Sequence, residues 1–176
     1  PYENYVFGNC EDVPNCEPDG DWPGAGNDMN PTVLIDDETG AVNMLWRSIN
    51  YTEGSGQSYY GLASADKWDS DYTFDLTNIF LPFSDCHIED GFSYKNKRGY
   101  HAVFHADCED DKSNPYHPAS GGHAYSLDGV NWTYHEKDAY SNKVELTTGE
   151  TWTLSRRERP KLILDHETGE ILALSN

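Results

Sequence analysis

The sequence is poor in basic residues and has no long apolar run. Lys and Arg total 12 against 31 Asp and Glu among 176 residues, so the net charge at pH 7 is −19. A surface this acidic repels phosphate backbones and anionic headgroups, so we expect no nucleic-acid partner and no anionic membrane partner. The apolar runs are short, as in Val33-Leu34-Ile35, whereas a membrane-spanning helix needs roughly 20 such residues. We therefore expect no membrane insertion.

Aromatic and turn-forming residues are plentiful. Aromatic residues make up 13% of the chain, which also has 15 Gly and 9 Pro. Aromatic residues favour strands, and Gly and Pro favour turns. No stretch shows the periodicity of an amphipathic helix. The length corresponds to a single domain, which we expect to be all-β.

The four cysteines include no C-x-x-C pair, which argues against a zinc ribbon or a thioredoxin-type motif. Cys10 and Cys16 flank a Pro-Asn turn signal. Cys86 and Cys108 are equidistant from a turn near position 97, so a hairpin would place their sulfur atoms opposite each other. We expect the disulfides Cys10–Cys16 and Cys86–Cys108, with four free thiols in a cytosolic protein as the alternative.

Two N-glycosylation sequons begin at Asn50 and Asn131. Together with the cysteine spacing and the acidity, they favour an extracellular protein or one in the secretory lumen. Both asparagines are therefore predicted glycosylation sites.

The chain contains a repeated hairpin pattern. Residues Pro31–Gly40 and Pro160–Gly169 each consist of a proline, four residues rich in β-formers and the sequence Asp-x-Glu-Thr-Gly. A third copy, Gly91–Phe104, has the same strand–turn–strand order around a Lys/Asn/Arg/Gly turn. All three predict β-hairpins.

A second pattern follows the first two hairpins. Small residues, an Asp and a Trp recur in Gly61–Trp68 and Gly122–Trp132, similar to the S-x-D-G-x-x-W turn between the outer strands of propeller blades. We expect Trp68 and Trp132 to occupy equivalent positions and to pack within their blades. A hairpin followed by strand–turn–strand makes four antiparallel strands, one blade of a β-propeller. A β-sandwich is the alternative.

The repeats predict about two and a half blades, over residues 30–74, 89–135 and 159–176, after an irregular lead-in over 1–29. Propellers need at least about four blades to close. The chain also begins at Pro1. We therefore expect a piece of a longer propeller, or a propeller completed by another chain.

Polar residues precede the first strand of each blade, in Asn27–Pro31, His87–Gly91 and Arg156–Pro160. In a propeller these segments converge at one mouth of the central channel. Converging carboxylates suit glycoside hydrolysis, which needs an acid and a base.

These segments resemble the motifs of glycoside hydrolase family 43, whose members are five-bladed propellers. Ile88-Glu89-Asp90-Gly91 is similar to the I-D-P step, with Gly in place of Pro, which implies that Asp90 orients and tunes the acid. Glu158-Arg159-Pro160 is similar to the E-G-P step, which implies that Glu158 is the general acid. The D-P step that supplies the base reads Asn30-Pro31 here, and Asp28 is the carboxylate that would have to substitute for it.

We therefore expect a carbohydrate-active propeller, with a catalytically inactive carbohydrate-binding or structural glycoprotein as the alternative. Arg157, which would clamp a substrate carboxylate, His105, His123 and Asn30 are the predicted substrate-binding residues. No cofactor or metal site is predicted. The acidic runs Asp36-Asp37-Glu38 and Glu109-Asp110-Asp111 leave calcium as an open alternative.

Overall fold

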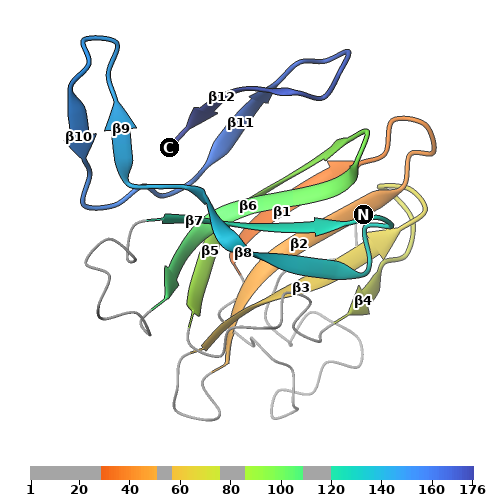
Figure 1. The fold of residues 1–176 in the computed structure, drawn as a ribbon. Coiled ribbons are helices and arrows are strands. Elements are labelled where there is room, and N and C mark those ends of the chain that lie inside the picture. Colours follow the sequence, from red (N-terminus) through yellow and green to blue (C-terminus); the bar gives the residue numbers. More distant parts are fainter. Residues whose placement is uncertain (1–28, 51–56, 76–85, 109–119) are drawn as a thin grey trace.

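The computed structural model describes residues 29–50, 57–75, 86–108 and 120–176, and these form only strands, turns and loops (Figure 1). They contain no helix long and apolar enough to cross a membrane. The strands build two four-stranded antiparallel sheets and two separate hairpins.

Each four-stranded sheet is a meander, in which every strand pairs with the next strand of the chain. The first sheet consists of β1 (Met29–Ile35), β2 (Val42–Asn50), β3 (Gln57–Ala65) and β4 (Thr73–Asp75). The second consists of β5 (Cys86–Asn96), β6 (Gly99–Cys108), β7 (Ser120–Ser126) and β8 (Trp132–Tyr140). This is the strand order of successive propeller blades, so the predicted fold class is confirmed. The number of blades in the complete propeller stays a prediction.

Two hairpins follow the second sheet. The third sequence repeat forms β11 (Lys161–Leu164) and β12 (Ile171–Ser175). Lys161 places its ammonium 5.5 Å from the ring centre of Phe92, which joins this hairpin to β5. Before it lies a hairpin of β9 (Lys143–Glu145) and β10 (Thr151–Thr153), which the repeat pattern does not predict.

The two Asp-x-Glu-Thr-Gly turns have the same hydrogen bonds, as expected from their shared sequence. One carboxylate oxygen of Asp36 accepts from the backbone N–H groups of residues 38 and 39 and from the hydroxyl of Thr39. Asp165 accepts the matching three bonds in the third repeat. Asp36 also pairs with Lys95 of β5, and this bond and those to Thr39 hold the pKa of the Asp36 carboxyl below its usual range. Asp36 is therefore engaged as a turn cap and an ion-pair partner.

The outer turn of the second sheet matches the predicted Asp/Gly turn. Asp128 accepts from the N–H groups of residues 130 and 131, and the indole N–H of Trp132 donates to the carbonyl of Gly129. Gly129 has a φ of 79°, a conformation that glycine adopts without steric cost. Trp132 packs against the core, as predicted.

The predicted packing role of Trp68 is wrong. Its side chain is 62% exposed, and Tyr72 is the aromatic residue that packs against the neighbouring core cluster. No glycine follows Asp66 at the position that Gly129 holds after Asp128. The first repeat therefore turns differently and leaves its tryptophan in solvent.

The predicted register of the second hairpin is confirmed, because β5 and β6 place Cys86 directly opposite Cys108. The disulfide itself stays a prediction, and Cys10 and Cys16 lie outside the described residues. Of the predicted glycosylation sites, Asn131 is exposed, with its amide donating to Asp128. Asn50 ends β2, and its side chain lies outside the described part.

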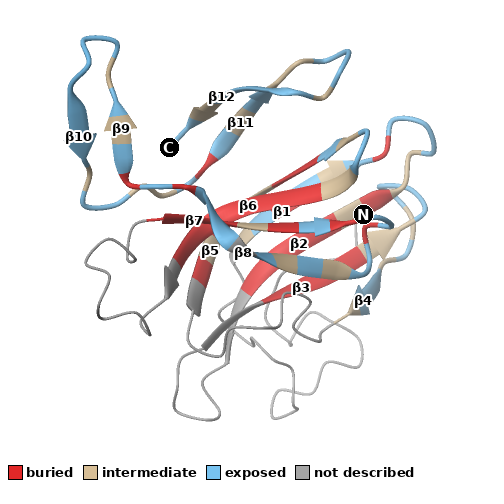
Figure 2. Ribbon diagram, in the orientation of Figure 1, coloured by how far each residue is buried: buried red, intermediate tan, exposed pale blue. Residues whose placement is uncertain are grey.

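The main core lies between the two four-stranded sheets, where the buried segments of β2, β3, β5 and β6 face one another (Figure 2). Tyr60 of β3 and Phe104 of β6 meet there with ring centres 5.9 Å apart. Polar contacts also join the first sheet to β5. The Thr32 and Ser93 hydroxyls lie 3.0 Å apart, and the Gly91 N–H donates to the Tyr60 hydroxyl. The two sheets thus pack as one unit and fix how the starts of β1 and β5 face each other.

Candidate functional site

Three residues at matching positions of the three repeats have left-handed backbones. They are Asn30, Asp90 and Arg159, with φ values of 54°, 58° and 54°. Each directly precedes the Pro or Gly that opens its repeat. Non-glycine residues in this region cost about 1–3 kcal/mol each and cluster at functional sites. The recurrence shows that the repeats share one backbone device at this end of the sheets.

In the first two repeats, this left-handed residue coincides with a local irregularity of the strand pairing. The β1–β2 pairing shifts register between Met29 and Thr32, and the β5–β6 pairing shifts between Glu89 and Phe92. A bulge of this kind bends a strand and redirects a side chain. The redirected residue of β5 is Asp90.

Asp90 lies at the centre of the three left-handed residues. It is only 8% exposed, its Oδ1 accepts from the Asn30 amide at 2.6 Å, and the Arg159 Nε lies 4.0 Å from the same oxygen. The structure therefore brings the predicted residues Asn30 and Asp90 into direct contact.

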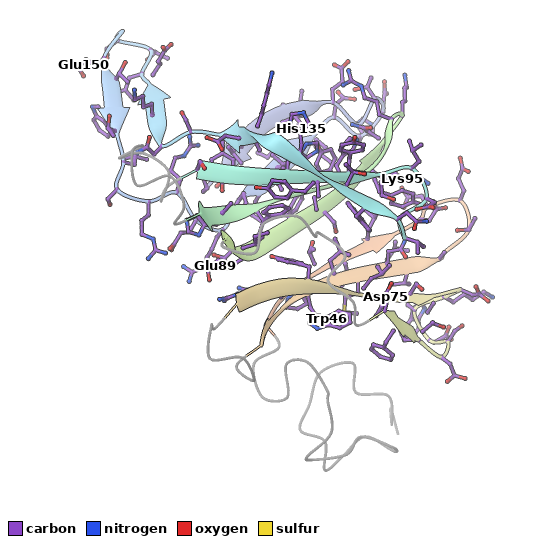
Figure 3. All side chains as sticks on the ribbon, turned by 60° about the horizontal axis from the view of Figure 1, so that its bottom comes forward. Trp46, Asp75, Glu89, Lys95, His135 and Glu150 are labelled. Atoms are coloured by element: carbon purple, nitrogen blue, oxygen red, sulfur yellow. The ribbon has the colours of Figure 1, made fainter. Side chains whose placement is uncertain are left out.

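Glu89, which is labelled in Figure 3, lies beside Asp90 in the chain and contacts a second group of polar side chains. Its Oε2 accepts from Arg47 of β2 at 2.9 Å, and its Oε1 lies 3.3 Å from the His105 Nδ1. Arg47 and His105 are buried, whereas Glu89 keeps 19% of its side chain exposed. A partly exposed carboxylate thus rests on the buried guanidinium of Arg47 and the buried imidazole of His105.

Glu158 reaches the same place from the loop between β10 and β11. Its Oε1 accepts from the Arg156 guanidinium at 2.7 Å, and the same nitrogen lies 3.9 Å from Glu89. Ligand atoms of Glu89, His105 and Glu158 all lie within 4.8 Å of one another. The predicted acid Glu158 therefore belongs to one cluster with His105.

This cluster has the donor types of a metal site, but it already holds two positive side chains. Arg47 and Arg156 lie 2.9 Å and 2.7 Å from the carboxylates of Glu89 and Glu158. A cation would have to displace these guanidinium groups. The pairing suits proton transfer or hydrogen bonding to a polar ligand better than metal binding.

Other predicted residues lie elsewhere or have other partners. Arg157 donates to Asn176 and to the Ser141 carbonyl, and its guanidinium lies 5.0 Å from the ring centre of Tyr140. These contacts tie the end of β8 to the end of β12. His123 contacts other histidines in the middle of β7 rather than this cluster. Asp28 and the acidic run 109–111 lie outside the described residues.

Sequence reasoning missed several members of the site. The sequence places Glu89 only within the Asp90 motif and gives Arg47 no role. Tyr140 was also missed: burial raises its pKa to about 12, with Asp90 and Glu158 among the nearby charges. For Glu89, the polar segment before the strand was an available signal. For Arg47, which lies in a buried strand, the one sequence signal was a charge among apolar neighbours.

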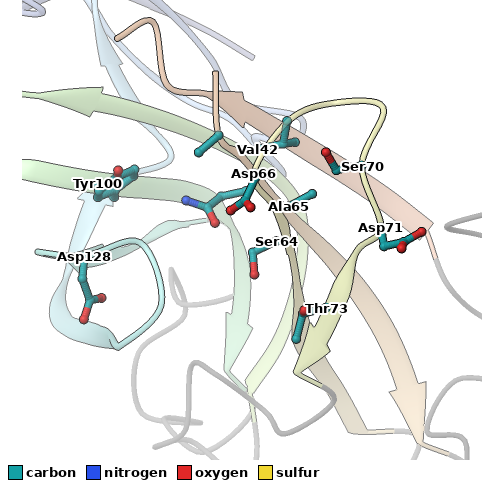
Figure 4. Close-up of a pocket in the computed structure, with 11 residues that line it drawn as sticks. Val42, Ser64, Ala65, Asp66, Ser70, Asp71, Thr73, Tyr100 and Asp128 are labelled. Carbon is teal, nitrogen blue, oxygen red and sulfur yellow. The ribbon is translucent and has the colours of Figure 1, made fainter. Parts of the chain in front are cut away.

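A pocket of about 540 Å³ lies at the opposite end of the sheets, beside the turns (Figure 4). Its acidic members are Asp66, Asp71 and Asp128. Hydrogen bonds from Asn131 and Val130 hold the pKa of Asp128 well below its usual range, so this carboxylate belongs to the turn. We assign no chemistry to this pocket.

No protein-family model and no curated protein matches the chain. One similar solved structure was reported with the GH130 family of mannoside phosphorylases, which contains glycoside hydrolases that target β-1,2 mannosidic linkages in Candida mannan. It has 18% identity and a TM-score of 0.45, over 72% of this chain and 35% of that one. Another, a candidate glycoside hydrolase from Parabacteroides distasonis, has 18% identity and a TM-score of 0.46, over 72% and 36%. The chain spans about a third of the length of these two proteins.

Proposed function

We propose that the mouth formed by Asn30, Glu89, Asp90 and Glu158 binds a glycan and that the protein is a secreted carbohydrate-active propeller. The observation that carries the proposal is the meeting of three carboxylates from two repeats, Glu89 and Asp90 of the second and Glu158 of the third, at one end of the sheets. Arg47 binds Glu89, Asn30 binds Asp90 and Arg156 binds Glu158. The side chains of Glu89 and Glu158 remain partly exposed. Sugars are recognised by such fixed arrays of acceptors and donors.

In the catalytic form of this proposal, Glu158 protonates the glycosidic oxygen and Asp90 orients the reacting group. Glu89 is the second carboxylate within reach of Glu158, with oxygens inside 4.8 Å. Retaining glycosidases place their two carboxyl groups about 5–5.5 Å apart, closer than the roughly 6.5–9.5 Å of inverting enzymes. The spacing favours Glu89 over a distant base as the partner of Glu158.

The second candidate is a propeller that binds glycans without cleaving them, as part of an extracellular assembly. Asn30 favours it, because an amide cannot act as a general base and here donates to Asp90. The Arg156 guanidinium, 2.7 Å from Glu158, also occupies the carboxyl group that would have to reach the glycosidic oxygen. Both candidate functions include the remaining blades of the propeller, supplied by the same chain or by another.

Hydrolysis of arabinan, xylan, galactan and uronate oligosaccharides by the intact native protein tests the proposal. If the protein is a hydrolase, Glu158→Gln should lower turnover at least 100-fold, since a general acid contributes about 10²–10⁴. Glu170→Gln is the matched control, because Glu170 is exposed in the β11–β12 turn. Turnover unchanged in Glu158→Gln would contradict the assignment of the acid.

The same panel separates the two candidates. No turnover by the native protein, with sugar binding retained, would support the binding protein and reject the hydrolase. Failure to bind any of these sugars would contradict the carbohydrate-directed mouth itself.

A further inference from the structure

The arginines of this acidic chain are concentrated at the candidate site. Four of the five lie at the mouth or in the loop that borders it: Arg47, Arg156, Arg157 and Arg159. The fifth, Arg98, is exposed in the turn between β5 and β6, at the opposite end of the sheets. A protein with a net charge of −19 therefore gathers guanidinium groups at one end, which makes the potential there less negative than elsewhere.

Two of these arginines are engaged within the protein. Arg47 has 5% of its side chain exposed and donates to Glu89. Arg157, which the sequence singles out as a carboxylate clamp, donates to the Asn176 side chain and to the Ser141 carbonyl. Both guanidinium groups therefore have partners in the fold. The remaining two arginines differ from them in exposure.

Arg159 has most of its side chain in solvent, with 78% exposed. Its left-handed backbone matches that of Asn30 and Asp90, the two residues that meet at the mouth. Its Nε lies 4.0 Å from the Asp90 Oδ1, a distance longer than a hydrogen bond, and the same oxygen already accepts from Asn30. Asp90 therefore keeps Arg159 near the mouth without covering it.

Arg156 is also largely exposed, at 57% of its side chain. Both of its ion pairs use the same nitrogen, Nη2, which lies 2.7 Å from Glu158 and 3.9 Å from Glu89. A guanidinium group has five N–H donors, so these contacts use a small part of what Arg156 offers. Exposed ion pairs contribute little to stability. Stabilisation of the fold therefore does not account for two exposed arginines at this mouth.

We propose that Arg156 and Arg159 bind the carboxylate of an acidic sugar, so that the ligand of the mouth is a glycan that carries a uronic acid. This inference rests on the proposed function and specifies its class of sugar. The planar guanidinium group matches a carboxylate through two parallel hydrogen bonds, which select for charge as well as for geometry. The neighbouring carboxylates of the mouth then accept from the hydroxyl groups of the same glycan.

The net charge of the chain limits how many anionic groups such a glycan carries. At physiological ionic strength the Debye length is about 8 Å, so a single carboxylate at the mouth interacts mainly with the nearby guanidinium groups. A glycan charged at every sugar would extend over the acidic surface and be repelled, given the net charge of −19. We therefore expect a neutral backbone that carries isolated uronates.

Calorimetric titration of the native protein with matched pairs of sugars tests the inference. The probes are a xylotriose and a galactotriose that each carry one glucuronic acid, and the methyl ester of each, which removes the charge and keeps the sugar. We expect at least one acid to bind at least about 10-fold more tightly than its ester. In NMR spectra, that acid should shift the Nε–H signals of Arg156 and Arg159 and leave that of Arg98 unchanged.

Substitution of the arginines tests which groups carry the preference for the acid. Arg159→Gln should bring the ratio of the two affinities close to one, and Arg156→Gln should also lower it, because each removes a guanidinium group from the mouth. Arg159→Lys should retain part of the preference, since it keeps the charge and loses the planar group. Arg98→Gln is the matched control and should keep the ratio within about twofold of the native value, because its charge is distant and screened. The substituted side chains are exposed, so unfolding curves should change little.

Failure of this inference differs from failure of the proposed function. Equal affinity for acid and ester, with neutral sugars still bound, would overturn the inference and leave the proposed function intact. Loss of the preference in Arg98→Gln as well would overturn it by showing a general effect of charge. Tighter binding of a galactotriose sulfate than of the matching uronate would replace the carboxylate by a sulfate ester and overturn the assignment. No binding of any of these sugars would contradict the mouth itself, and this inference with it.

Discussion

Replacing Phe104 by alanine is expected to lower the free energy of unfolding by about 3–5 kcal/mol. Phe104 is fully buried between the sheets, with its ring centre 5.9 Å from Tyr60 and 5.7 Å from Tyr134. Gly122 leaves room for it, since a Cβ there would lie 2.1 Å from the Phe104 ring. Truncation removes the contacts of the whole ring and leaves a cavity in the main core.

This substitution should also loosen the candidate site. The Tyr60 hydroxyl accepts from the Gly91 N–H, next to Asp90, and burial holds the pKa of Tyr60 well above its usual range. Chemical denaturation measures the loss, with Val130→Ala as the control, because Val130 is 47% exposed. Exposed substitutions usually change stability by less than about 0.5 kcal/mol. A loss below about 1 kcal/mol in Phe104→Ala would contradict the packing of the two sheets.

Replacing Arg47 by methionine should cost about 3–5 kcal/mol, the range for removing one partner of a buried ion pair. Arg47 has 5% of its side chain exposed and lies 2.9 Å from Glu89. Without the guanidinium, Glu89 loses this close ion pair beside buried His105. The stability loss should appear together with loss of glycan binding.

A double substitution separates the charge effect from the loss of packing. Arg47→Met combined with Glu89→Gln removes both charges, so it should be clearly more stable than Arg47→Met alone. Lys97→Met is the control, because Lys97 is exposed in the β5–β6 turn. If the double variant is as unstable as the sum of the single variants, Arg47 stabilises the fold by packing and not through Glu89.

The sequence was sufficient to predict features that depend on local patterns. The Asp36 and Asp165 turns form the same bonds because the side chain and its backbone partners are within three residues. The Cys86–Cys108 register follows from counting outward from one tight turn. The polar segment before each repeat, together with the resemblance to the family 43 motifs, pointed to Asp90 and Glu158, whose roles stay predictions.

Features that depend on contacts between sheets were not predictable from the sequence. Arg47 meets Glu89 across 42 positions, and only the packing of β2 beside β5 brings them together. The β9–β10 hairpin has strands of three residues each, too short for a clear alternation. Its Thr147-Thr148-Gly149 turn was the available signal. Trp68 was misplaced because it follows Asp66 by two positions, whereas Trp132 follows Asp128 by four and has a glycine in its turn; the shared Asp and Trp concealed this difference.

The central claim is that a glycan binds at the mouth, beside the three left-handed residues. The most direct test is a two-dimensional NMR titration of the isotope-labelled native protein with arabinan, xylan, galactan and uronate oligosaccharides. The account predicts that one sugar shifts the amide signals of Asn30, Asp90 and Arg159 together with their neighbours, and leaves Asp66 and Asp128 at the opposite end unchanged. Shifts confined to the opposite end, or no shift with any of the sugars, would contradict it.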